Sequence, residues 1–157
     1  MNICIVQARL NSQRLEKKMF LNIHGRYLID WVHYRISKIK NIDKLVFAIP
    51  FNQNNDYLYE HLKNKDLNIH RGSETNVLKR FYSYLIKYSN LRPNLIRICA
   101  DRPLISYQEV DKLINFFNKN EFDYAYNHIP HKNNYPIGFG AEICSYDCFL
   151  RIYSKAK

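Results

Sequence analysis

Glycine is scarce in this sequence, and its scarcity excludes two common phosphate-binding loops. Only four of the 157 residues are glycine. No G-x-G-x-x-G motif follows the first apolar run, and the chain contains no Walker loop. If the chain binds phosphate, we expect Arg, Lys and neutral side-chain donors to supply the contacts.

Long apolar runs and low-complexity tails are also missing. No apolar run approaches the roughly 20 residues that span a bilayer, and the first residues lead directly into a predicted strand without a leader segment. We therefore expect a cytoplasmic protein without a membrane segment. The net charge of +10 would suit nucleic acid, acidic lipid or a phosphorylated small molecule. The absence of a basic tail and of an RNA-binding motif argues against nucleic acid as the partner.

Cysteine is sparse, and its spacing does not indicate a metal site. Cys4 and Cys99 fall inside predicted strands, where cysteine acts as a small core residue. Cys144 and Cys148 lie four residues apart, without a second Cys or His pair nearby to complete a zinc site.

The apolar pattern predicts one α/β domain over residues 1–157. We expect strands at residues 2–6, 44–49, 67–70, 95–99, 123–127 and 140–144, and an extended piece at 20–25 closed by a glycine turn. We expect helices at 27–40 and 56–63, a third capped by Thr75, a fourth opened by Ser106 and a last one capped by Ser145. Alternation of strands and helices indicates a mostly parallel sheet with helices on both faces.

Cations and neutral donors cluster directly after the first strand. The segment at 7–18 contains Gln7, Arg9, Ser12, Gln13, Arg14, Lys17 and Lys18. Ligands bind at the carboxyl edge of open α/β sheets, and clustered cations suit a polyphosphate. A solvated basic loop is the alternative interpretation of this segment alone.

Two further polar sites follow predicted strands. One is the segment from Arg71 to Glu74, and the other is Asp101. We expect these strand ends to converge on one crevice with the first loop. A carboxylate beside cations fits a magnesium ion that bridges phosphate oxygens, although Asp101 could also be a turn residue before Pro103.

Four motifs occur in a characteristic order: QARLNSQRLEKK, RGSETNVLKRFY, RICADRPLI and PIGFGAEICSYDCF. With these motifs the sequence resembles the cytidylyltransferase family, which includes CMP-sialic acid and CMP-Kdo synthetases, and especially its spore-coat polysaccharide branch. The resemblance implies a nucleotide-diphospho-sugar transferase fold of the GT-A/Rossmann-like type. It also implies an Mg-dependent nucleotidyltransferase that moves CMP from CTP to a sugar acid or related sugar in surface polysaccharide or glycan biosynthesis, releasing pyrophosphate.

The resemblance also implies roles for individual residues. The base would lie against Gln7 and Ala8, and the second motif, Arg71 to Glu74 with Ser73, would lie near the nucleotide. Glu142 matches an acidic position on the substrate side. Asp101 matches the metal ligand, and catalysis would rest on Arg14, Lys18 and Asp101. The phosphate-loop positions are Arg9, Ser12, Arg14 and Lys18.

The sequence departs from the family pattern at several positions. Asn11 stands where glycine is usual, and Glu16-Lys17 replaces a Pro-Gly pair. Thr75 and Asn76 stand where acids are common, and Gly140 stands where a second aspartate is frequent. Relatives usually continue past the equivalent of Lys157, with a part that often supplies substrate contacts and a homodimer surface. These departures leave open a C-terminally truncated or catalytically degenerate relative that binds a nucleotide or a partner; a basic RNA-binding protein is a third hypothesis.

Overall fold

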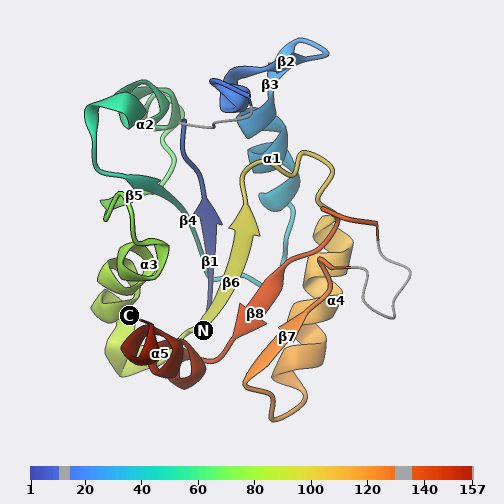
Figure 1. Ribbon diagram of the computed structural model, residues 1–157. Helices are drawn as coiled ribbons and strands as arrows, with labels where there is room; N and C mark the ends of the chain where they lie inside the picture. Colours follow the sequence, from blue (N-terminus) through green and yellow to red (C-terminus); the bar gives the residue numbers. More distant parts are fainter. Residues whose placement is uncertain (11–14, 130–135, 157) are drawn as a thin grey trace.

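The computed structural model describes residues 1–10, 15–129 and 136–156 and contains a six-stranded sheet (Figure 1). The strand order is β5-β4-β1-β6-β8-β7. Strand β1 pairs in parallel with both β4 and β6, and β4 pairs in parallel with β5. Strand β8 runs antiparallel to β6 and β7. The predicted mostly parallel sheet is confirmed. The strand bounds are β1 Asn2–Gln7, β4 Lys44–Pro50, β5 Ile69–Gly72, β6 Asn94–Cys99, β7 Tyr124–Tyr126 and β8 Glu142–Cys144.

Alternation along the strands divides the core between the two faces of the sheet. Cys4 and Val6 pack in a cluster with helices α1 (Leu28–Ile36), α2 (Asp56–Lys63) and α4 (Tyr107–Asn118). Ile3 and Ile5 point to the other face, where they pack with α3 (Val77–Leu85) and α5 (Tyr146–Lys155). Successive strand residues face opposite sides, so a continuous apolar run fills both layers. Helices α3 and α5 lie side by side in Figure 1.

Short elements connect this framework. Strands β2 (Asn22–Ile23) and β3 (Arg26–Tyr27) form an antiparallel hairpin. Gly25 closes its turn with φ of +76°, a conformation that glycine adopts without strain, as the predicted glycine turn requires. The 3₁₀ helices η1 (Lys18–Phe20), η2 (Gln53–Asn55) and η3 (Ile86–Leu91) complete the described elements.

Several predicted boundaries were wrong. Helix α1 ends at Ile36 rather than residue 40. Strand β5 lies two residues further along than predicted, because its parallel register with β4 joins Phe47 to Ile69 and Pro50 to Gly72. Strands β7 and β8 are each shorter than expected.

The cap of α3 was also assigned to the wrong residue. The N-cap is Asn76, whose side chain accepts a hydrogen bond from the Lys79 backbone N–H at 2.8 Å. Asn is the slightly better N-cap of the two, and it displaces the predicted Thr75. The predicted caps Ser106 and Ser145 are confirmed, because each accepts a backbone N–H three residues on.

Every helix in the described ranges is too short or too polar to cross a membrane.

Candidate active site

The carboxyl ends of β1, β4 and β6 meet at one edge of the sheet, which is the top edge in Figure 1. The backbone N–H of Ala8 donates to Ala48 at 3.2 Å, and that of Ala100 donates to the Gln7 carbonyl at 3.0 Å. These bonds hold the segments that leave the three strands next to one another. Polar side chains just beyond the strands therefore face a common region.

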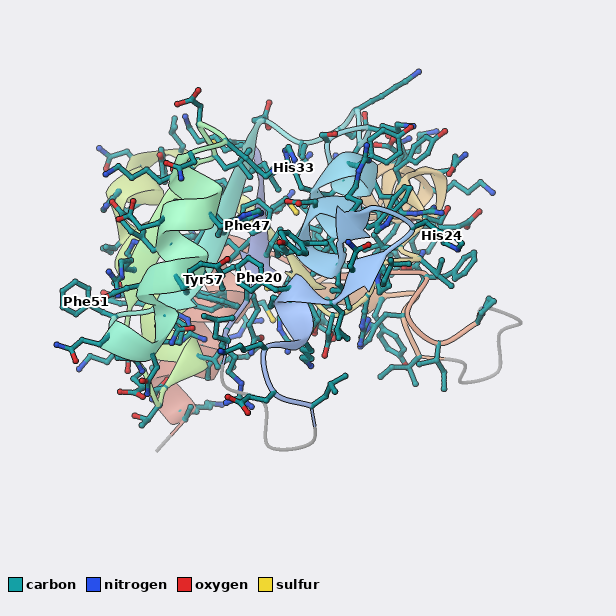
Figure 2. All side chains as sticks on the ribbon, turned by 90° about the horizontal axis from the view of Figure 1, so that it is seen from above. Phe20, His24, His33, Phe47, Phe51 and Tyr57 are labelled. Carbon is teal, nitrogen blue, oxygen red and sulfur yellow. The ribbon has the colours of Figure 1, made fainter. Side chains whose placement is uncertain are left out.

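Lys18 is fixed over this edge by its own short helix. It begins η1, which follows Lys17 in a left-handed backbone conformation with φ of 50°. The next residue, Met19, is buried in the core. Figure 2 looks down on this edge and shows Phe20 beside Tyr57 of α2, with ring centroids 4.6 Å apart. Two apolar anchors thus set the direction of the Lys18 side chain.

Lys18 and Asp101 form an ion pair across the edge. The Lys18 Nζ atom lies 2.6 Å from Asp101 Oδ2. Partial burial acts to raise the pKa of Asp101, but the hydrogen bond and positive charge of Lys18 outweigh it and hold the pKa below its usual value. Because its pKa is lowered, the carboxylate is ionised at neutral pH, and with 42% of the side chain exposed it remains accessible to a ligand.

A cavity of about 230 Å³ lies where β1 and β4 end and α3 begins. It brings together the predicted residues Gln7, Arg9 and Glu74 from segments far apart in the sequence. The other polar residues that line it are Asn52, Asn55, Thr75 and Arg80.

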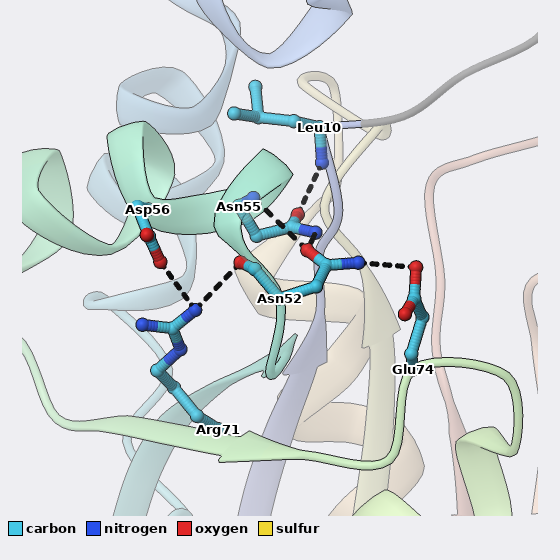
Figure 3. A network of polar contacts seen from close by, with 6 residues as sticks. All are labelled: Leu10, Asn52, Asn55, Asp56, Arg71 and Glu74. Carbon is cyan, nitrogen blue, oxygen red and sulfur yellow. Dashed lines mark hydrogen bonds and ion pairs between the residues drawn. The ribbon is translucent and has the colours of Figure 1, made fainter.

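A chain of amide contacts shapes one wall of this cavity (Figure 3). The Leu10 backbone N–H donates to Asn55 Oδ1 at 2.8 Å, and Asn55 Nδ2 donates to Asn52 Oδ1 at 2.5 Å. Asn52 Nδ2 then donates to a carboxylate oxygen of Glu74. Asn55 is buried, so its pairing with Leu10 fixes the start of the first loop relative to η2.

Arg71 and Ser73 do not line the cavity. Arg71 donates to Asp56 at 2.6 Å and to the Asn52 carbonyl at 2.8 Å, and its guanidinium lies over the Phe51 ring. Figure 2 shows Phe51 pointing away from the body of the protein. The Ser73 hydroxyl accepts the Asn76 backbone N–H, so its side chain serves the turn before α3. The predicted crevice therefore unites some of the strand-end residues but leaves Arg71 outside it, paired with Asp56.

Glu142 lies on the far side of Gln7. It is paired with Arg97, and the Tyr124 hydroxyl donates to its second oxygen at 2.5 Å. Arg97 also donates to the Gln7 side chain at 3.0 and 3.1 Å. Burial, together with the hydrogen bond to Glu142, raises the pKa of Tyr124. These four residues line a second cavity of about 310 Å³, which shares Gln7 and Val77 with the first.

The predicted phosphate-loop residues Ser12 and Arg14 lie outside the described residues, so their roles stay predictions. Within the described ranges, no group of three or more His, Cys, Asp or Glu side chains is arranged to hold a metal ion.

Gly140 cannot carry the second aspartate that is frequent in the family without a local rearrangement. A Cβ atom at this position would overlap the backbone carbonyl and side-chain oxygen of Asn127. Asn127 is itself fixed, because it exchanges hydrogen bonds with Ala141 through both its backbone N–H and its side-chain oxygen.

Sequence reasoning missed four polar residues around the two cavities. Asn52 and Asn55 follow the β4 strand, and this position after a buried strand was a usable signal. Arg80 interrupts the apolar stripe of α3, and Arg97 interrupts the apolar run of β6, so each is a charge in an otherwise buried pattern.

The family model named Cytidylyltransferase matches residues 3–134. The chain belongs to the cytidylyltransferase family. Among curated relatives, the chain is 31% identical over 155 residues to the uncharacterized protein MJ1063 of Methanocaldococcus jannaschii, covering 99% of the chain and 61% of that protein. It is 28% identical over 153 residues to the spore coat polysaccharide biosynthesis protein SpsF of Bacillus subtilis, covering 94% and 60%. The chain thus spans about three fifths of these two relatives.

A third curated relative carries an assigned activity. It is the 3-deoxy-manno-octulosonate cytidylyltransferase of Fusobacterium nucleatum, 30% identical over 119 residues, with 74% of this chain and 46% of that protein covered.

Solved structures share the fold. A cytidylyltransferase from Leptospira borgpetersenii matches with a TM-score of 0.87 at 22% identity, covering 99% of this chain and 64% of that one. A CMP:2-keto-3-deoxy-manno-octonic acid synthetase complexed with CTP matches with a TM-score of 0.76 at 12% identity, covering 100% and 79%. The cytidylyltransferase fold, a nucleotide-diphospho-sugar transferase fold, is therefore present as predicted.

Proposed function

We propose that this cytidylyltransferase moves a CMP group from CTP to a sugar acid or related sugar and releases pyrophosphate. The product would serve surface polysaccharide or glycan biosynthesis. The observation that carries the proposal is the Lys18–Asp101 pair, which lies 2.6 Å apart at the carboxyl edge of the sheet in a member of this family. A cation and a carboxylate at that edge are the groups that a nucleoside triphosphate and its counter-ion require.

The reaction needs positioning and charge neutralisation more than covalent help from the protein. An acceptor hydroxyl oxygen would form a bond to the α-phosphorus, and the bond from that phosphorus to the pyrophosphate oxygen would break. Lys18, with Arg9 and Arg14, would hold the triphosphate and stabilise the charge that develops on its oxygens. Glu142 would face the acceptor from the second cavity, which adjoins the first at Gln7.

Asp101 suits a magnesium ion by the chemistry of its donor atoms. Magnesium prefers oxygen ligands and is commonly held by one or two carboxylates together with substrate phosphates. One partly exposed carboxylate at this edge meets that requirement if phosphate oxygens complete the set. When bound, the ion would polarise the α-phosphate and the leaving pyrophosphate.

The test is pyrophosphate release from CTP with a panel of sugar acids, each measured with and without magnesium. We expect release that depends on CTP, on one acceptor and on magnesium. CTP binding in a titration experiment, without release for any acceptor, would refute the catalytic part of the proposal. Absence of binding to every nucleotide would refute the whole.

A non-catalytic nucleotide-binding role is the second candidate, and the packing of Gly140 favours it. Relatives often carry a second acidic residue where this chain has Gly140. Here Asn127 occupies the space that such a side chain would need, so Asp101 would act without a second carboxylate. This alternative predicts magnesium-dependent CTP binding with no turnover. Pyrophosphate release above background would exclude it.

A further inference from the structure

A third cavity lies between the β2–β3 hairpin, helix α1 and the end of α2, and we call it the hairpin groove. Its volume is about 620 Å³, which is within the roughly 300–1,000 Å³ of pockets that hold a drug-sized ligand. It shares no lining residue with the two cavities at the strand ends. Figure 2 shows His33, which lines the groove, between α2 and α1. The lining residues that matter most for binding are Arg26, Tyr27, Asp30, His61 and Lys65.

Arg26 places a cation with fixed orientation at this groove. Its guanidinium lies over the Trp31 ring at 4.6 Å and over the Tyr34 ring at 4.8 Å. These ring contacts hold the guanidinium in place. Among the described residues, no acceptor is paired with its N–H groups. A planar fork of donors matches a carboxylate in a bidentate contact, so Arg26 is prepared to bind an acid group of a ligand.

Asp30 supplies an acceptor in the same groove. Its side chain is only 14% exposed, and Oδ1 lies 2.8 Å from His61 Nε2 and 3.6 Å from Lys65 Nζ. Both contacts use Oδ1, and the described part of the chain gives Oδ2 no partner. A neutral His61 donates from Nε2 to this carboxylate, which leaves Nδ1 as an acceptor. The groove therefore contains two acceptor atoms that a ligand with donor groups could satisfy.

A saccharide that carries a carboxylate has the groups that this lining requires. Its acid group accepts from Arg26, and its hydroxyl groups donate to Asp30 and His61. A ligand ammonium group would also donate, but the cations Arg26 and Lys65 would repel it. The Tyr27 ring is 36% exposed and offers apolar surface to the C–H groups of a sugar ring.

We propose that the hairpin groove binds a short acidic saccharide, with Arg26 on a carboxylate and Asp30 on hydroxyl groups. A neutral saccharide lacks the partner for Arg26, and an anion without hydroxyl groups lacks the donors for Asp30. Binding therefore needs both kinds of group in one molecule. Because the groove and the proposed CTP site have separate linings, the saccharide and CTP should bind independently.

The experiment is a calorimetric titration of the protein with three probes. Trigalacturonate has sugar rings and carboxylates, maltotriose has rings without charge, and tricarballylate has three carboxylates without hydroxyl groups. We expect trigalacturonate to bind on the order of ten- to a hundredfold more tightly than either of the others, the scale of one charge-assisted hydrogen bond. No binding of trigalacturonate, or an equal affinity for either of the other probes, would overturn the proposal.

A titration in the presence of CTP distinguishes this site from the proposed active site. Saturating CTP should leave the affinity for trigalacturonate unchanged. Competition between the two ligands would place the saccharide at the strand ends and overturn the proposal. Failure of trigalacturonate to bind would leave the proposed CTP reaction intact, because that reaction is tested by CTP binding and pyrophosphate release.

Two variants locate the contact, with folding checked by circular dichroism. Arg26→Ala should weaken trigalacturonate binding by about tenfold or more while CTP binds as before. Arg151→Ala removes the same charge from an exposed residue of α5, which packs on the opposite face of the sheet from α1, and should leave both affinities unchanged. Full affinity in Arg26→Ala would refute the proposed site. An equal loss in Arg151→Ala would also refute it, because the saccharide would then respond to net charge alone.

Discussion

At the scale of single residues, Asp101 is the side chain whose role is most sharply testable. Asp101→Asn keeps the shape and the turn-forming ability of the residue but removes the charge that a magnesium ion needs. We expect pyrophosphate release to fall by at least ~100-fold, the scale of a Lewis-acid contribution of several kcal/mol. Because a partly exposed ion pair is worth only about 0.2–1 kcal/mol, unfolding by urea should change little.

Asp123→Asn is the matched control for Asp101→Asn. Asp123 also forms an ion pair at 2.6 Å, with Arg151, but at the β7 edge far from the strand ends. Its replacement should leave turnover unchanged. If Asp101→Asn were as active as the parent, the carboxylate would be a structural turn residue.

Arg14 and Arg26 offer a second comparison between single residues. Arg14 belongs to the predicted phosphate loop and lies outside the described residues, whereas Arg26 stacks on Trp31 and Tyr34 at 4.6 and 4.8 Å. Arg14→Ala should weaken CTP binding by roughly tenfold to a hundredfold, because a charge-assisted contact contributes about 1.5–3 kcal/mol. Arg26→Ala should leave the affinity unchanged. Equal affinities in a titration would remove Arg14 from the phosphate site.

At the scale of elements, the pattern of apolar residues predicted the strands and helices more accurately than it predicted the polar contacts between them. Continuous apolar runs such as 2–6 identify strands buried on both faces, and the structure confirms them. The pairing of Lys18 with Asp101 also follows from strand ends that share one edge. By contrast, Asn55 and Arg80 meet only when η2 and α3 pack beside β1. The local pattern marks both residues as unusual, but it does not give the contacts that they make.

The packing of Gly140 against Asn127, beside β7 and β8, can be tested by its effect on stability. Gly140→Ala should destabilise the fold by about 3 kcal/mol, because the added methyl group overlaps the backbone of Asn127 and the neighbouring strands must shift. Gly25→Ala is the control: its methyl group meets nothing within 4 Å, and only the positive φ of +76° costs about 1 kcal/mol. Urea unfolding of both variants gives the comparison, and equal losses would contradict the packing argument.

At the scale of the whole molecule, the net charge of +10 bears on which class of ligand the protein binds. The cations whose contacts are described are largely engaged in separate ion pairs and ring contacts, as with Arg151 on Asp123 and Lys38 over Tyr34. Such a distribution favours a small anionic ligand at the sheet edge over a continuous nucleic-acid track. The RNA-binding hypothesis would need affinity that falls steeply with salt, and no retention of RNA on a filter at low salt would end it.

Three half-buried histidines, His33, His70 and His128, make the stability of the fold depend on pH. Burial, followed in size by the charge of Lys87, lowers the pKa of His70; burial likewise lowers the pKa values of His33 and His128. In the unfolded chain an imidazole titrates near pH 6.5. Between the folded and unfolded pKa values, the unfolded state therefore binds more protons, so the free energy of unfolding falls as the pH is lowered.

We therefore expect the protein to lose stability steadily from pH 7.5 to pH 5.5, a window that lies above the ordinary carboxylate titrations. His70→Gln can still hydrogen bond to the Ser83 hydroxyl, which lies 2.7 Å from His70 Nε2, but it cannot take up a proton. Its free energy of unfolding, measured in urea across this window, should depend less on pH than that of the parent. His24→Gln, at an exposed position in the hairpin turn, should follow the parent curve. A His70→Gln curve as steep as the parent's would show that another group carries the dependence, because the lowered pKa of His70 can act on stability only through its own proton.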